Sequence, residues 1–143
     1  MAVSDDVKKR FAEYIKLQVF DEKYISREKE KKILGEAVMR FEIGIDDSRA
    51  IMSSVAAVND FIFERDVDRL VKEIMQAFAS LDRYISRKEF YHAANIYRQL
   101  SGGYIGEGEA RRRLKQMMVE NDWKPRRDNI IMPPRWYMMI SEK

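Results

Sequence analysis

The residues with the clearest binding chemistry are basic and aromatic side chains near the C-terminal end of the chain. Three consecutive arginines, Arg111 to Arg113, precede a segment in which further cations are mixed with aromatic rings. Guanidinium groups pair with carboxylates and phosphates, and rings stack on bases or pack on apolar partners. The candidate partner-binding residues are Arg111, Arg112, Arg113, Trp123, Arg126, Arg127, Arg135, Trp136, Tyr137 and Met138.

The distribution of charge bears on how this set is interpreted. Residues 1–60 carry 11 Lys and Arg against 12 Asp and Glu, residues 61–123 carry 11 against 10, and residues 124–143 carry 5 against 2. The body of the chain is therefore nearly neutral, which gives a nucleic-acid partner little support. Three interpretations stay open: a solvated cationic face with rings packed on the body, a surface for a protein or anionic partner, and a nucleic-acid surface.

Acidic residues in two turns offer a second kind of chemistry, the binding of a divalent cation through carboxylate oxygens. The residues that would hold it are Asp21, Glu22 and Asp82. An EF-hand loop in the second turn would need an oxygen ligand at Phe78 and glycine at Arg83. Helix capping and compensation of the helix dipole explain acidic residues at helix ends without any metal. The prediction is that no metal or other cofactor is bound.

Catalytic patterns are missing from the sequence. His92 is the only histidine, there are no cysteines, and no serine lies in a nucleophile motif. Gly102 and Gly103, followed by Gly106 and Gly108, have no preceding strand and no following lysine of a phosphate-binding loop. They fit a helix end and the turn after it, and the chain is predicted not to be an enzyme.

The sequence also favours a cytoplasmic location. It has no run of about 18 apolar residues, so no transmembrane helix is expected. The polar stretch at residues 1–10 is unlike a signal peptide.

The elements that must position these residues come from an internal repeat. Tyr24-Ile25-Ser26-Arg27 recurs as Tyr84-Ile85-Ser86-Arg87, and the same gap-free offset of 60 pairs Ile45 with Ile105 and Ala50 with Ala110. Helical spacing of apolar residues predicts three helices in each copy. We therefore expect an all-α fold of about six helices in two pseudo-symmetric repeats, residues 5–63 and 65–123, forming one domain over residues 1–123.

Local signals define several helix ends. Ser26 and Ser86 are predicted N-caps, and Ser86 with Glu89 forms a capping box. Gly44, like Gly102 and Gly103, is expected to end a helix.

The last segment, residues 124–143, is expected to be an irregular basic and aromatic arm. It is too apolar for an idle solvated end, because methionines and aromatic rings follow its two adjacent prolines. We expect it to fold back over the groove between the two repeats, and otherwise to be the partner-binding element.

The segment from Asp21 to Glu28, the helix after it, and Gly44-Ile45-Asp46-Asp47 before another helix resemble the tellurite-resistance TerB-like domain. The resemblance covers residues 5–123 and implies an all-helical, stress-associated module that acts in assemblies. It also implies a metal on acidic side chains in some members. This chain departs from that pattern because Lys23 and Arg83 replace the glycine of the turn.

Together these features predict a non-enzymatic protein-interaction or adaptor module that binds through the arm or the groove between the repeats. One alternative is a nucleic-acid-binding protein that uses the last helix and the arm. The other is a stress protein that binds a divalent metal.

Overall fold

A computed structural model describes residues 3–20, 22–127 and 134–141. Within these residues the predicted all-α class is confirmed. The helices are α1 (Asp5–Gln18), α2 (Arg27–Met39), α3 (Ile45–Asn59), α4 (Glu64–Phe78), α5 (Arg87–Leu100), α6 (Glu107–Glu120) and α7 (Arg135–Met138). Six correspond to the predicted number, and α7 is a short helix in the arm for which the sequence predicts irregular structure. None of the helices in the described ranges could cross a membrane.

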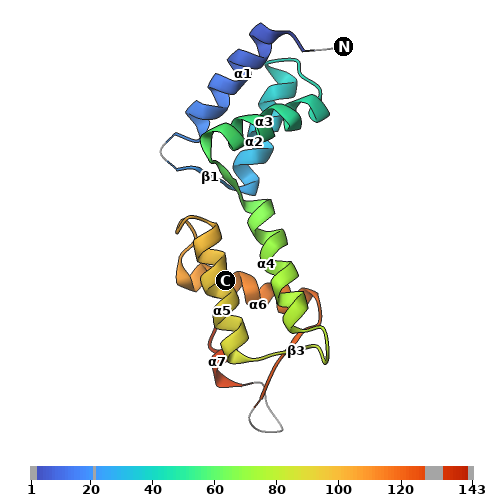
Figure 1. Ribbon diagram of the computed structural model, residues 1–143, viewed down its shortest axis with the longest axis vertical. Coiled ribbons are helices and arrows are strands. Elements are labelled where there is room, and N and C mark those ends of the chain that lie inside the picture. The colour runs from blue at the N-terminus through green and yellow to red at the C-terminus, as the bar shows by residue number, and fades with distance from the viewer. Residues whose placement is uncertain (1–2, 21, 128–133, 142–143) are drawn as a thin grey trace. The chain divides into compact units, whose positions relative to one another are not determined.

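The chain divides into two compact units, residues 1–65 and 66–143. The element order α–β–α–α–β occurs in both, first as α1 to β2 and then as α4 to β4 (Figure 1). Helix α4 begins with the last two residues of the first unit, and the arm belongs to the second.

In the first unit a pair of very short strands connects distant parts of a three-helix bundle. β1 (Tyr24–Ile25) pairs in parallel with β2 (Ile62–Phe63). The Ile62 N–H donates to the Lys23 carbonyl at 2.7 Å. The core beneath consists of Phe11, Ile15, Val19, Ile25, Ile33, Leu34, Ala37, Ile43, Met52, Val55, Ala56 and Phe63. The sequence predicts a turn here but not the pairing, because two residues carry no periodicity.

The second unit has a corresponding pair of strands. β3 (Tyr84–Ile85) pairs in parallel with β4 (Lys124–Pro125), and the Lys124 N–H donates to the Arg83 carbonyl at 2.8 Å. The first residues of the predicted irregular arm are therefore a strand. The buried apolar residues of this unit are Val67, Val71, Met75, Ala79, Ile85, Phe90, Ala93, Ala94, Tyr97, Ile105, Ala110, Leu114, Met118 and Trp123.

The predicted serine N-caps are confirmed. The Ser26 hydroxyl accepts from the Lys29 N–H at 3.1 Å. At α5 the Ser86 hydroxyl accepts from the Glu89 N–H at 3.1 Å, and the Glu89 carboxylate accepts from the Ser86 N–H at 2.8 Å. This reciprocal pair is the expected capping box, which satisfies two backbone donors at the start of α5.

Of the glycines predicted to end helices, two do so and one does not. Gly102 and Gly103 follow α5 with left-handed φ angles of 68° and 81°, as a helix end requires. Gly44 is instead the N-cap of α3, with φ −62°. The left-handed residue after α2 is Glu42, with φ 56°. The prediction that Gly44 ends the preceding helix is wrong because α2 stops earlier.

The gap-free offset of 60 is wrong for the third helix of each unit. Ser26 and Ser86 are N-caps 60 residues apart, but the N-caps of α3 and α6 are Gly44 and Gly106, which are 62 apart. The buried counterpart of Ile105 is thus Ile43, whereas Ile45 is 41% exposed. Likewise the counterpart of Ala110 is Ser48 and not Ala50, since Ala110 and Ser48 are both fully buried. The shift of two arises because α5 is one residue longer than α2 and the segment after it, residues 101–106, is one residue longer than residues 40–44.

We predict that Ser86→Ala lowers the free energy of unfolding by about 1 kcal/mol, because it removes the side-chain acceptor at the start of α5. Urea denaturation followed by circular dichroism measures the change. Ser53→Ala is the matched control, since Ser53 is an exposed position within α3. Equal stability of the two variants would refute a stabilising role for the cap.

Candidate functional site

The described part of the arm, residues 134–141, packs on α5 and α6 of its own unit, whereas the prediction placed it over the groove between the two repeats. The Trp136 ring lies 5.2 Å from the Phe90 ring and 6.1 Å from the Tyr91 ring, between centroids. The Lys115 Nζ donates to the Ile140 carbonyl at 3.1 Å and lies 4.8 Å from the centre of the Tyr137 ring. Aromatic packing and a buried lysine therefore hold α7 against α5 and α6.

The folded arm forms one wall of a pocket that is open to solvent and has a volume of about 610 Å³. Its walls come from α5, α6 and the folded arm, and the charged, aromatic and methionine side chains that line it are Arg87, Tyr91, Glu109, Arg111, Arg112, Trp136 and Met139. The volume is in the range of small-molecule and side-chain binding sites. We call it the arm pocket.

Two of the three arginines in the run on α6 share one carboxylate. Arg112 donates from Nε to Glu109 Oε2, and Arg113 donates from Nε to Glu109 Oε1, both at 2.9 Å. These bonds, the one from Arg112 first, hold the pKa of Glu109 at about 2. Arg113 also donates to the Tyr97 hydroxyl at 2.9 Å. Both guanidinium groups are therefore built into the surface of the unit.

The other two cations of the pocket share one aromatic ring. The Arg111 Cζ lies 4.5 Å and the Arg87 Cζ 5.4 Å from the centre of the Tyr91 ring. Arg111 also donates to Glu107, while its buried Nε has no hydrogen-bond partner among the described residues. The negative face of the ring attracts each cation, but the like charges repel each other. An anion that bridges them would relieve this repulsion.

The structure brings together only some of the predicted binding residues. Arg111, Arg112 and Trp136 line the arm pocket, whereas Tyr137 packs on Trp136 with ring centres 5.9 Å apart. The exposed residues Arg135 and Met138 belong to α7, which forms the adjoining surface.

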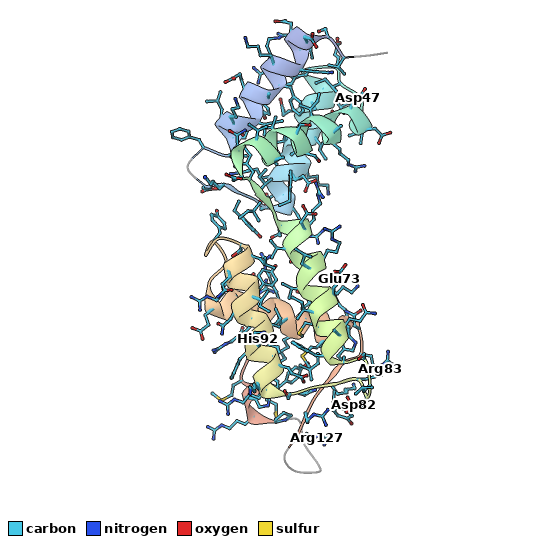
Figure 2. All side chains as sticks on the ribbon, in the orientation of Figure 1. Asp47, Glu73, Asp82, Arg83, His92 and Arg127 are labelled. Carbon is cyan, nitrogen blue, oxygen red and sulfur yellow. The ribbon has the colours of Figure 1, made fainter. Side chains whose placement is uncertain are left out.

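The remaining predicted residues have other surroundings. Trp123 is only 7% exposed, so its assignment to a binding surface is wrong: the ring packs in the core of the second unit. Arg126 pairs with Asp82, and its Nη2 lies 2.7 Å from Oδ2. Arg127 is exposed just after β4, at the end of the unit where Asp82 also lies (Figure 2).

Sequence reasoning missed Arg87 and Tyr91. The available signal was in the sequence. Ser86 is a predicted N-cap, so Arg87 and Tyr91 lie on the helix that follows it, and their spacing of four residues places both on one face of that helix.

The acidic residues proposed for a metal have other partners. The Glu22 carboxylate accepts from Lys29 Nζ at 3.1 Å. Asp82 accepts from the Tyr84 N–H at 3.0 Å, and this bond, together with Arg126, lowers the pKa of Asp82. Asp21 lies outside the described residues. Within those residues no three metal-ligating side chains of His, Cys, Asp or Glu come together.

His92 is an exposed residue of α5, as a histidine without a catalytic partner would be (Figure 2). Its ring centre lies 6.4 Å from that of Phe78.

Comparisons with protein-family models, with curated proteins and with solved structures find no match to this chain.

We predict that Glu109→Gln destabilises the protein at pH 7 by about 0.5–1 kcal/mol, the scale of a partly exposed ion pair. The pKa of Glu109 lies below the unfolded value of about 4.3, so its contribution is complete above that pH and is lost as the pH falls toward 2. Urea denaturation at pH 7 and pH 2.5 measures the difference from the wild-type protein. The difference should shrink at the lower pH, and a constant difference would contradict the ion-pair origin. Glu73→Gln on exposed α4 surface is the control.

Proposed function

We propose that the protein is a non-enzymatic protein-interaction module that binds an acidic and apolar segment of a protein partner in the arm pocket. The observation that carries the proposal is the pair of guanidinium groups, Arg87 and Arg111, which lie against one tyrosine ring at a pocket walled by the folded-back arm. Such a lining of cations and rings is suited to recognition more than to catalysis.

Each wall of the pocket contributes a different part of the recognition. A carboxylate of the partner would accept charge-assisted hydrogen bonds from the exposed Arg87 and from the outer edge of Arg111. An apolar side chain beside that carboxylate would pack on Trp136 and Met139. The methionine is 72% exposed and flexible, which suits a surface that adapts to its partner. Trp and Arg are also the residues that most often dominate the energy of protein interfaces.

The nucleic-acid alternative has less support from the same geometry. Binding to a phosphate backbone needs several cations free to replace counterions. On α6, Glu107 accepts from Arg111, and Glu109 accepts from Arg112 and Arg113. The three arginines of the run are therefore paired with two carboxylates, so most of their charge is already compensated.

The metal alternative is also less favoured. Glu22 and Asp82 accept from the cations Lys29 and Arg126, and a metal would have to displace these contacts.

The resemblance to TerB-like domains belongs to this proposal. The repeated element order α–β–α–α–β supports the interpretation of the two units as repeats, with two residues inserted in the second. A role in stress-associated assemblies, as the resemblance implies, is consistent with a binding module.

We predict that Arg87→Ala reduces recovery of a specific protein partner by about tenfold, which corresponds to the loss of about 1.4 kcal/mol of binding free energy. The measurement is affinity purification from the protein's own cells with quantitative mass spectrometry. Arg98→Ala is the matched control, because Arg98 is an exposed arginine at the other end of α5.

The proposal fails if both variants recover the same proteins in the same amounts. Recovery of nuclease-sensitive nucleic acid without a stoichiometric protein would support the rival function instead.

A further inference from the structure

An apolar groove lies between α1 and α3 of the first unit, far in sequence from the arm pocket. Its volume is about 550 Å³, which is large enough to receive side chains of a partner. The floor is formed by small and branched apolar residues, and charged residues stand at its edges. The floor residues are Val3, Ala12, Ala50, Ile51 and Val55, and the edge residues are Lys8, Lys9 and Asp47.

At the corresponding surface of the second unit, side-chain hydrogen bonds connect the three helices α4, α5 and α6. Tyr97 of α5 donates from its hydroxyl to Asp68 of α4 and accepts from Arg113 of α6. The N-caps align α2 with α5 and α3 with α6, and the buried residues Phe11 and Val71 align α1 with α4. In this alignment the first unit has Lys8, Ala37 and Ile51 at these three positions.

Two further differences enlarge the groove. Ala12 aligns with Lys72, and Ala50 aligns with Arg112. Short side chains thus replace long ones where the helices α1 and α3 face the groove. Small residues let the backbone of a guest helix approach closely, whereas the long side chains of the second unit would hold it away.

The edges of the groove carry charges that are available to a partner. Lys8 and Lys9 are exposed on the α1 side, and Asp47 is exposed on the α3 side. Among the residues that the structure describes, none forms an ion pair or side-chain hydrogen bond with these three. Their arrangement favours a guest that is acidic along one edge, and oppositely charged edges fix its orientation.

We propose that this groove is a second docking surface, which takes an amphipathic helix from a protein partner. The apolar face of the guest, with residues at positions i, i+3, i+4 and i+7, would lie on Ala12, Ala50 and Ile51. Acidic side chains along one edge of the guest pair with Lys8 and Lys9.

A synthetic peptide of about 18 residues tests the proposal, since shorter isolated helices are marginally stable. It carries leucine at i, i+3, i+4 and i+7 and glutamate along one edge, and a peptide of scrambled order is its control. Fluorescence anisotropy gives the affinity, and amide chemical shifts locate the binding surface. We expect saturable binding of the patterned peptide, with shifts on α1 and α3 that remain in the Arg87→Ala variant, so that any binding at the arm pocket is distinguished from binding at the groove.

The Ala50→Arg variant should weaken this binding by about tenfold or more, because it places in the groove the residue that the second unit has there. Ala50 is exposed and within a helix, so arginine is compatible with folding. Ser53→Arg adds the same side chain on an exposed position of α3 that does not line the groove, and it should retain binding. Arg87→Ala, which affects only the arm pocket, should retain it as well.

Three results would overturn the proposal. The two arginine variants on α3 could bind the peptide equally, or the scrambled peptide could bind as well as the patterned one. Shifts on α1 and α3 that appear on raising the protein concentration without peptide would identify a second copy of this chain as the occupant instead.

Discussion

Each unit depends on a parallel pair of two-residue strands. The backbone bonds from Ile62 to Lys23 and from Lys124 to Arg83 join segments about 40 residues apart in sequence. Lys23 and Arg83 are left-handed, with φ angles of 49° and 67°, a conformation that costs a non-glycine residue about 1–2 kcal/mol. This cost is offset because the two residues after each left-handed position form the strand that pairs with β2 or β4. The serine caps follow at once, so the strand pair fixes where α2 and α5 begin.

The residue four positions after the serine N-cap makes a polar contact in the first unit and an aromatic contact in the second. In the first unit it is Glu30, whose carboxylate accepts from Arg65 Nε at 2.8 Å and 3.0 Å. In the second unit it is Phe90, on which Trp136 packs. This ion pair is partly exposed, with the Arg65 side chain 39% accessible, and its two hydrogen bonds require a fixed geometry, whereas aromatic rings pack favourably in several arrangements. The arm can therefore shape a pocket where the first unit has a fixed polar contact.

The extent to which the sequence predicts the structure depends on the range of each signal. Most local signals succeeded: Ser86 with Glu89 indicated a capping box, and helical spacing indicated the all-α class, although Gly44 proved to begin a helix and not to end one. Signals that require pairing over a long distance failed, as at the strands. Trp123 was assigned to the surface because a tryptophan beside basic residues fits binding and core packing equally well, and only burial distinguishes the two. The arm pocket combines α5, α6 and α7, which no sequence window contains, although the spacing of Glu107 and Arg111 was a readable sign of neutralised charge.

Proline in β4 has a consequence for how the second unit meets other chains. In this parallel pair Lys124 and Arg126 donate toward β3, so the residue between them, Pro125, stands where a backbone donor would point outward. Proline has no N–H, and the outer edge of β4 therefore lacks the donor that an added strand would need. Edge-to-edge association through an added strand is therefore discouraged at β4.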